Sequence, residues 1–139
     1  MIKEIIKDVE VLSQKSERFV LSGEDDYIVT DLLDTANAHK DVCAGLAAIQ
    51  LGIPKRVIVV RNGDKFIPYI NPAIVGKSPQ KYLAVEGCLS IEGEREVRRH
   101  RSIKVVFTDS KGKQRCQTFN GVIAQILQHE IDHCNGILI

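Results

Sequence analysis

The stretch at 128–133, which reads QHEIDH, carries the residue types of a metal centre. If it is helical, as the apolar residues before it indicate, His129 and His133 lie one turn apart on one face and can bind one metal ion. Glu130 falls beside them. A carboxylate next to a metal-activated water, but not itself a ligand, is where a general base is needed. The pattern predicts metal-assisted hydrolysis with Glu130 as the acid/base.

A site of this kind usually takes three protein ligands and leaves one position for water. Only six residues follow His133, too few for the downstream glutamate of gluzincin-type enzymes, and Ile139 stands where the metzincin pattern has its third histidine. We therefore expect the third ligand upstream. Imidazole and thiolate both bind first-row metals, and the side chains that offer them include Cys43, Cys88, Cys116, His39 and His100.

The cysteines differ in their surroundings. Cys88 lies between a glycine and a short polar loop, which makes it more accessible than a core cysteine. Cys43 and Cys116 lie in apolar or strand contexts and are expected to be packing residues. Cys134 follows His133 directly and so points about a quarter turn away from it, which makes it a poor co-ligand.

Composition places the chain among ordinary globular proteins. It has 139 residues, 44% hydrophobic and 27% charged, with a net charge of +1, and we expect one domain over 1–139. The small net charge gives no argument for DNA or an anionic membrane as a partner. The apolar runs are too short to span a bilayer, and the N-terminus is too charged for a signal peptide, so we expect a cytoplasmic protein with free thiols.

The periodicity predicts helix, several antiparallel strands, then helix. A capping-box-like start at Ser22 and Asp25 predicts a helix over 24–40, after an irregular lead-in with a short helix. Strands are expected at 56–60 and 65–70, ending at Asn71-Pro72, then at 81–85, 103–107 and 114–119. The last helix should run from Asn120 to Gly136. The fold class is α+β, with antiparallel β-sheets packed around a central C-terminal metal-binding helix.

The segment 41–52 is dense in small residues, which let a backbone or a ligand approach closely. Its plain interpretation is a tight helix-to-strand connection in the core. Gln50 near its end has a side-chain amide that can donate to an oxyanion. The basic run from Arg95 to Lys104 has interleaved glutamates and no aromatic stacking partners, so it indicates a solvated strand face rather than an RNA site.

Taken together, GLAAIQ at 45–50, EGCLS at 86–90 and QHEIDH at 128–133 make this chain resemble peptide deformylase over nearly its whole length. The three motifs stand in the family's order, and their joint occurrence is far more specific than HExxH alone. Two departures concern the first motif. Cys43-Ala44 precedes it where the family usually has a glycine, and Ile49 replaces a proline or small residue.

The resemblance implies an activity and a role for each matched residue. A divalent ion, typically ferrous iron with zinc or nickel as alternatives, would be bound by Cys88, His129 and His133. Glu130 would be the acid/base that removes the formyl group from N-formylmethionyl peptides and nascent chains, which is compatible with transient proximity to the ribosome. Gln50 and the backbone N–H of Leu89 would stabilise the oxyanion, Gly45 and Leu46 would lie along the substrate backbone, and Glu86 would be held by Arg99.

The methionine side chain of such a substrate needs an apolar slot. Helix positions one turn before His129 are natural walls, so Val122 and Ile126 are candidates, with residues 83–85 as further candidates and plain core packing as the alternative. Two other functions stay open at this point. One is a metallopeptidase or other amidase that uses the same metal chemistry, and the other is a non-catalytic protein whose metal serves binding or stability.

Overall fold

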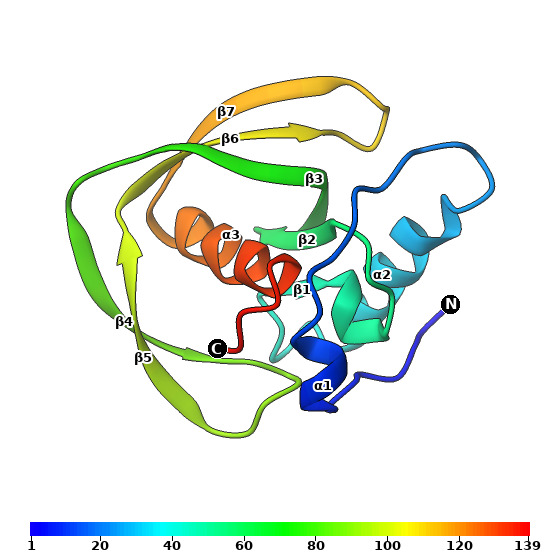
Figure 1. Cartoon of the computed structure of the whole chain (residues 1–139), viewed down its shortest axis with the longest axis horizontal. Coiled ribbons are helices and arrows are strands. Elements are labelled where there is room, and N and C mark those ends of the chain that lie inside the picture. The colour runs from blue at the N-terminus through cyan, green and yellow to red at the C-terminus, as the bar shows by residue number, and fades with distance from the viewer.

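The C-terminal helix is the central element of the molecule, in a computed structural model that describes all 139 residues (Figure 1). Two antiparallel sheets and a second long helix surround it. The elements in chain order are α1 (Val9–Leu12), α2 (Tyr27–Ala38), β1 (Gly45–Ala47), the 3-10 helix η1 (Ala48–Leu51), β2 (Val57–Asn62), β3 (Lys65–Lys77), β4 (Lys81–Gly87), β5 (Glu94–His100), β6 (Ser102–Thr108), β7 (Gln114–Asn120) and α3 (Gly121–Cys134).

The sheets are a five-stranded one in the order β1-β2-β3-β6-β7 and a two-stranded hairpin, β4-β5. Every strand pair is antiparallel. The predicted α+β class, with antiparallel sheets around a C-terminal helix, is therefore confirmed. β1 and β4 each have one edge without a strand neighbour. Residues of both strands line the same cleft as His129 and Glu130 of α3. None of the helices is both long enough and apolar enough to span a membrane.

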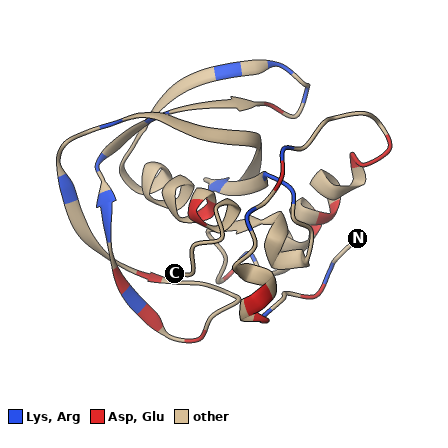
Figure 2. Cartoon of the chain, in the orientation of Figure 1, with Lys and Arg blue, Asp and Glu red and all other residues tan.

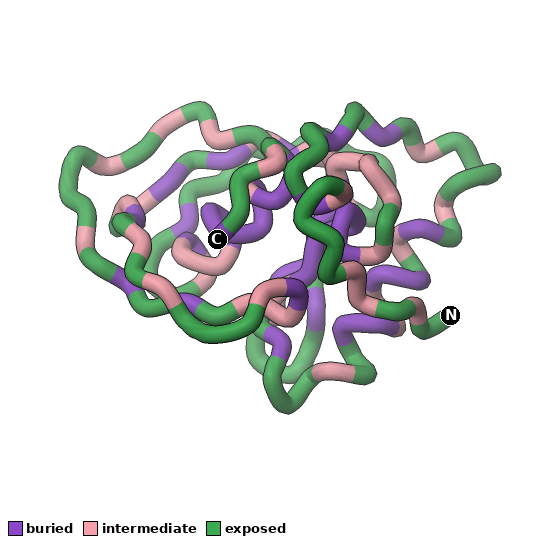
Figure 3. Tube along the Cα trace, turned by 60° about the horizontal axis from the view of Figure 1, so that its bottom comes forward, coloured by how far each residue is buried: buried purple, intermediate pink, exposed green.

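α3 is buried on more than one face (Figure 3). Its apolar side packs with β-strand residues in the main core, through Ala124, Leu127, Ile131 and Cys134. Its polar side chains are buried as well, which is unfavourable unless they find hydrogen-bond partners. Gln128 finds them across the gap to β5, where it accepts from the backbone N–H of His100 and donates to the His100 and Ala124 carbonyls. This amide ties α3 to the β4-β5 hairpin.

α2 covers a second core on the other side of the five-stranded sheet, where Ile28, Leu32 and Ala36 pack against β2 and β3 residues. The helix is shorter at both ends than the predicted 24–40. It begins at Tyr27 because Asp26 takes the N-cap position, and no side chain there makes the capping hydrogen bond that the Ser22 pattern predicted. Asp25 and Asp26 instead form the turn that precedes the helix, with their carbonyls accepting from the first helical N–H groups.

The predicted end of a strand at Asn71-Pro72 is wrong, since β3 continues to Lys77. Asn71 adopts a left-handed φ of 51°, and the register with β6 shifts between Ile70 and Ala73. Its side-chain amide replaces strand pairing by bonding both the N–H and the carbonyl of Phe19, each at 2.7 Å. A bulge held by a distant segment therefore lets the chain pass a proline without leaving the sheet.

The segment that follows α1 crosses the end of α3. The Ser16 N–H donates to the Cys134 carbonyl, and Arg56 donates to the carbonyls of both residues. Gly136 ends the helix with a φ of +74°, as the sequence predicted, and a Cβ at this position would lie 2.4 Å from the Ser13 carbonyl oxygen. The close approach of two backbones thus requires a glycine here.

Gly136→Ala should lower the free energy of unfolding by about 3 kcal/mol, because it adds a backbone clash to the strain of a left-handed alanine. The matched control is Gly112→Ala, whose φ is +81° but whose Cβ would have nothing within 4 Å. It should lose only about 1 kcal/mol. Denaturant titration of both variants measures the difference, and equal losses would contradict the assigned contact with Ser13.

Candidate metal centre

Three side chains converge at the open edge between α3 and the loop after β4. His133 Nε2 lies 3.2 Å from His129 Nε2 and 3.4 Å from Cys88 Sγ, and the three donor atoms all lie within 4.8 Å of one another. With usual bond lengths, tetrahedral ligands of one ion are about 3.3 Å apart for two nitrogens and about 3.6 Å apart for nitrogen and sulfur. The donor set and its spacing therefore fit one first-row divalent metal ion.

A buried charged network orients His129. Its Nδ1 lies 2.8 Å from Glu86 Oε1, and Arg99 holds the same carboxylate through two hydrogen bonds of 2.7 and 2.9 Å. Arg99 also donates to Asp132, one turn along α3, at 2.6 Å. The predicted contact between Glu86 and Arg99 is thus present. Because Glu86 holds Nδ1, the Nε2 atom of His129 is directed at Cys88 and His133. Metal-binding histidines commonly have such a hydrogen-bond partner on the ring nitrogen that does not bind the metal.

The charges in this network are strongly coupled. Burial would raise the pKa of Glu86, but hydrogen bonds from Arg99 and His129 outweigh it and lower that pKa to about 2. Burial would likewise lower the pKa of His129, but hydrogen bonds to Cys88 and Glu86 raise it to about 10. Burial and the neighbouring charge of His129 lower the pKa of His133 to about 3. Protonation is therefore favoured on His129 and disfavoured on His133.

Glu130 is fully buried beside the donor cluster, and its Oε1 atom has no hydrogen-bond partner. Burial raises its pKa to about 7, with a further contribution from the charge of Glu86. The backbone of β1 packs directly on it, since a Cβ on Gly45 would lie 2.9 Å from Glu130 Oε2. An unpartnered carboxylate with a pKa near neutrality is suited to accept and return a proton.

The side chain of Gln50, in η1, lies beside the Cys88 thiol. The segment around it was expected to connect a helix to a strand, but it forms the edge strand β1 followed by η1. Gln50 Oε1 accepts from the Ala47 N–H at 3.0 Å, which fixes which end of the amide faces outward. Nε2 then donates to Ser90 Oγ at 3.1 Å and lies 3.4 Å from Cys88 Sγ. The amide nitrogen is therefore directed at the Ser90 hydroxyl and the Cys88 thiol.

These residues line one cleft of about 570 Å³ between β1, α3 and the β4-β5 hairpin. Most of the predicted site residues lie along it: Gly45, Gln50, Glu86, Cys88, Leu89, Ile126, His129 and Glu130. His133 and Arg99 lie beneath the surface, and the side chain of Leu46 is buried in the core on the α2 side.

Several other predicted positions lie elsewhere. Val122 is 71% exposed and outside the cleft, because the first turn of α3 projects into solvent, and Gln125 lines the cleft beside Ile126. The packing role predicted for Cys116 is wrong, since Cys116 is exposed on the edge strand β7, whereas Cys43 and Cys134 are buried. The imidazoles of His39 and His100 bond backbone carbonyls away from the cluster.

Two supporting residues were not predicted. Ser90 accepts the hydrogen bond that orients Gln50, and Asp132 holds the far side of Arg99. Asp132 could have been predicted from its spacing, because it lies three residues after His129 and therefore on a neighbouring face of the same helix. Ser90 lies in the EGCLS motif, but nothing local paired it with Gln50, which is 40 residues away in the chain.

Known proteins resemble this chain over its whole length or nearly so. The family model described as polypeptide deformylase matches residues 2–139. A peptide deformylase of Clostridium beijerinckii is 42% identical over 139 residues and covers the whole of both chains. The Thermotoga maritima peptide deformylase structure superimposes with a TM-score of 0.90 at 30% identity, covering 99% of this chain and 95% of that one. An Acinetobacter baumannii peptide deformylase with bound Met-Ala-Ser gives 0.88 at 28% identity, covering 99% and 96%.

Proposed function

Because the chain belongs to the peptide deformylase family of enzymes, we propose that it removes the N-formyl group from formylmethionine at the start of newly made polypeptides and releases formate. The observation that carries this proposal is the convergence of Cys88, His129 and His133 next to a buried, unpartnered Glu130. In the reaction, the C–N bond of the formamide breaks, and water supplies the second oxygen of formate.

Cys88, His129 and His133 would hold one divalent ion, for which we propose Fe²⁺, with Zn²⁺ and Ni²⁺ as alternatives. When bound, such an ion polarises a carbonyl and lowers the pKa of water, and a thiolate ligand moderates its Lewis acidity. The network of Glu86 and Arg99 would keep His129 in the tautomer that binds through Nε2.

Glu130 would move the proton. Its carboxylate takes a proton from the attacking water and then gives one to the nitrogen of the leaving methionine, so that a neutral amine departs. Its pKa near 7 supports both steps, since a group that titrates near the working pH both accepts and donates readily. The lack of a competing hydrogen bond at Oε1 leaves it free for this water.

Gln50 and the backbone N–H of Leu89 would stabilise the oxyanion on the formyl carbon. Gln50→Ala should lower kcat by about a hundredfold to a thousandfold, because one preoriented donor is lost. Metal content should stay unchanged, since the Gln50 side chain is not a ligand in this proposal. Steady-state kinetics with metal analysis on the same sample measures both, and a near wild-type rate would remove Gln50 from the oxyanion site.

The substrate would bind as an extended chain between the free edges of β1 and β4. Gly45 and Leu46 would pair with its backbone, and Ile126, with Gln125 rather than the exposed Val122 beside it, would form the slot for the methionine side chain. The related Acinetobacter baumannii structure supports this choice of substrate, since the Met-Ala-Ser bound to it is the product of deformylating formyl-Met-Ala-Ser.

Substrates of this kind are nascent chains, so we propose a cytoplasmic enzyme that acts in transient proximity to the ribosome. Residues 1–139 would act as one catalytic domain, because α3 takes part both in the main core and in the proposed site.

The direct test is formate release from formyl-Met-Ala-Ser under anaerobic conditions, with the protein loaded with iron or nickel. We expect formate in a one-to-one ratio with free Met-Ala-Ser. Cleavage of unformylated Met-Ala-Ser at a peptide bond would favour the metallopeptidase alternative. A folded, metal-loaded sample that releases no formate would favour a binding protein.

A further inference from the structure

Gln125 is a polar residue in the wall that we assign to the methionine side chain. It lines the cleft beside Ile126 and lies one turn of α3 before His129, so the two side chains are neighbours on one face of the helix. Packing an amide against an apolar ligand costs free energy unless the amide keeps a hydrogen bond. The amide therefore indicates a ligand atom that accepts a hydrogen bond.

Tyr82 determines which end of this amide is available. Its hydroxyl, on β4, donates to Gln125 Oε1 at 3.0 Å. The guanidinium of Arg101 lies 5.2 Å from the centre of the Tyr82 ring, an attractive contact that helps to hold the ring in place. Residues 97–108 contain no carboxylate, and this end of the β4-β5 hairpin carries basic but no acidic residues (Figure 2). No acidic side chain of this segment therefore competes with the ring for Arg101.

The Nε2 end of Gln125 has two N–H donors and no hydrogen-bond partner in the protein. The other side-chain amide in the cleft, that of Gln50, is already engaged, since its Nε2 donates to Ser90. Lys7 is a further donor, but it is exposed and lies beside η1, where the Ile6 N–H donates to the Gln50 carbonyl. Gln125 thus supplies the free amide donor on the α3 side of the cleft.

Methionine and its oxidised form differ in what they offer such a donor. The thioether sulfur of methionine is a weak acceptor, whereas methionine sulfoxide carries a polar oxygen on the same sulfur. In an entirely apolar slot that oxygen would lose its water without a replacement partner, which weakens binding. A free amide N–H supplies the replacement. The sulfoxide sulfur is also a stereocentre, so a donor on one wall favours the epimer whose oxygen points toward it.

We propose that this chain also deformylates peptides that begin with formyl-methionine sulfoxide, with Gln125 donating to the sulfoxide oxygen and Tyr82 positioning the Gln125 amide. This inference rests on the proposed deformylase function and extends its substrate class. The reaction is the same hydrolysis of the formamide, and the sulfoxide takes no part in it, so no oxidant or reductant is consumed. One hydrogen bond of this kind should change kcat/KM by about threefold to tenfold.

The test compares kcat/KM for formyl-Met-Ala-Ser with kcat/KM for the two separated sulfoxide epimers of that peptide, measured as formate release at full metal loading. The better epimer should react within about tenfold of the methionine peptide and exceed the other epimer by about threefold to tenfold. Gln125→Leu, which keeps the approximate size but removes both donors, should lower the sulfoxide-to-methionine ratio by about tenfold and make the epimers nearly equal. Tyr82→Phe should lower the ratio by about threefold, because the amide is no longer held.

Two matched controls lie outside the cleft. Gln114→Leu changes an exposed glutamine of β7, and Tyr27→Phe changes an exposed tyrosine at the start of α2. Both should leave the ratio unchanged, and so should Lys7→Met, which removes the amine at the rim of the cleft.

Three results would overturn the role of Gln125 and leave the deformylase proposal standing. One is a wild-type protein on which both epimers react more than about tenfold more slowly than the methionine peptide. The others are a ratio that survives Gln125→Leu and a ratio that Lys7→Met lowers as much as Gln125→Leu does. Absence of formate from the methionine peptide as well would overturn both proposals.

Discussion

Glu130→Gln should lower kcat/KM for formyl-Met-Ala-Ser by about a hundredfold to ten-thousandfold, the range usual for removing a positioned acid/base. The amide keeps nearly the volume of the carboxylate, so it should fit the same buried space against Gly45. It cannot accept the proton of the water or return one to the leaving amine. The loss should therefore appear in kcat rather than in substrate binding.

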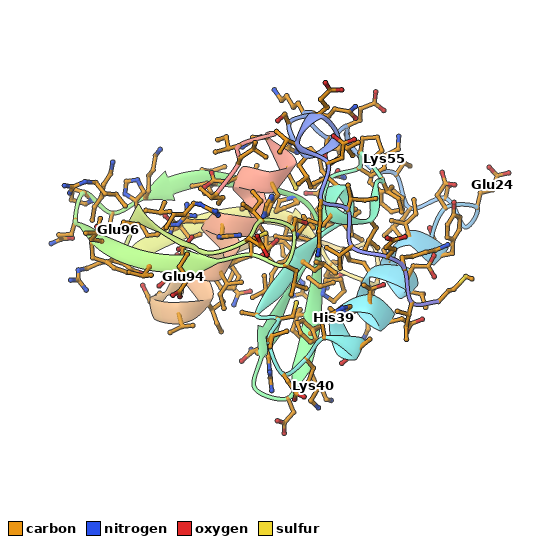
Figure 4. All side chains as sticks on the ribbon, turned by 90° about the horizontal axis from the view of Figure 1, so that it is seen from below. Glu24, His39, Lys40, Lys55, Glu94 and Glu96 are labelled. Carbon is orange, nitrogen blue, oxygen red and sulfur yellow. The ribbon has the colours of Figure 1, made fainter.

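Glu130→Gln also separates catalysis from metal binding. Metal content should remain near one ion per chain, because Glu130 is not among the three converging donors. The control is Glu24→Gln, at an exposed position remote from the cleft (Figure 4), which should retain wild-type kinetics. A Glu130→Gln enzyme with near wild-type turnover at full metal loading would exclude the proposed proton transfer.

Local patterns predicted α3 and its histidines well because everything they need lies within a few residues. The spacing of His129 and His133, the apolar period before them and the glycine at 136 define a helix whose one face can bind an ion. The strands that form β2-β3 and β6-β7 were predicted for the same reason, since each pair of strands is adjacent in sequence.

The missed features depend on distant partners. Asn71 holds the bulge of β3 through Phe19, which is 52 residues earlier, so the Asn-Pro pair alone indicated an end that does not occur. The small-residue segment could not indicate the edge strand β1, whose only strand neighbour is β2. Cys116 was assigned to packing from its strand context, but β7 is an edge strand exposed along most of its length.

The third metal-binding candidate shows the same limit. Spacing left five side chains as candidates, because Cys88 and His133 meet across 45 residues of chain. Resemblance to a family selected Cys88, and the structure brings that thiol beside the histidines. Glu86, two residues before Cys88, binds Arg99, and Arg99 also binds Asp132 on α3. A nonlocal ionic network thus holds the loop at the helix, and no periodicity in the sequence encodes it.

Cys88→Ala should therefore abolish formate release. It should also lower metal affinity by more than about a hundredfold, because losing a metal ligand should reduce the affinity more than losing a residue that only hydrogen-bonds to a ligand. The fold should persist, because Cys88 is only partly buried and the contacts of Glu86, Arg99 and Gln128 do not involve it. Metal analysis after dialysis and the rate of formate release measure the two effects.

A thermal measurement distinguishes loss of metal from loss of fold. A ligand that binds only the folded state raises Tm, so a chelator should lower the Tm of the metal-loaded wild-type protein. It should leave the Tm of Cys88→Ala unchanged, because that variant has little metal to lose. Cys116→Ala, which removes an exposed thiol outside the cluster, should behave like the wild type. If Cys88→Ala instead keeps a full metal complement and a chelator-sensitive Tm, the thiolate is not a ligand, and the two histidines must find their third partner elsewhere.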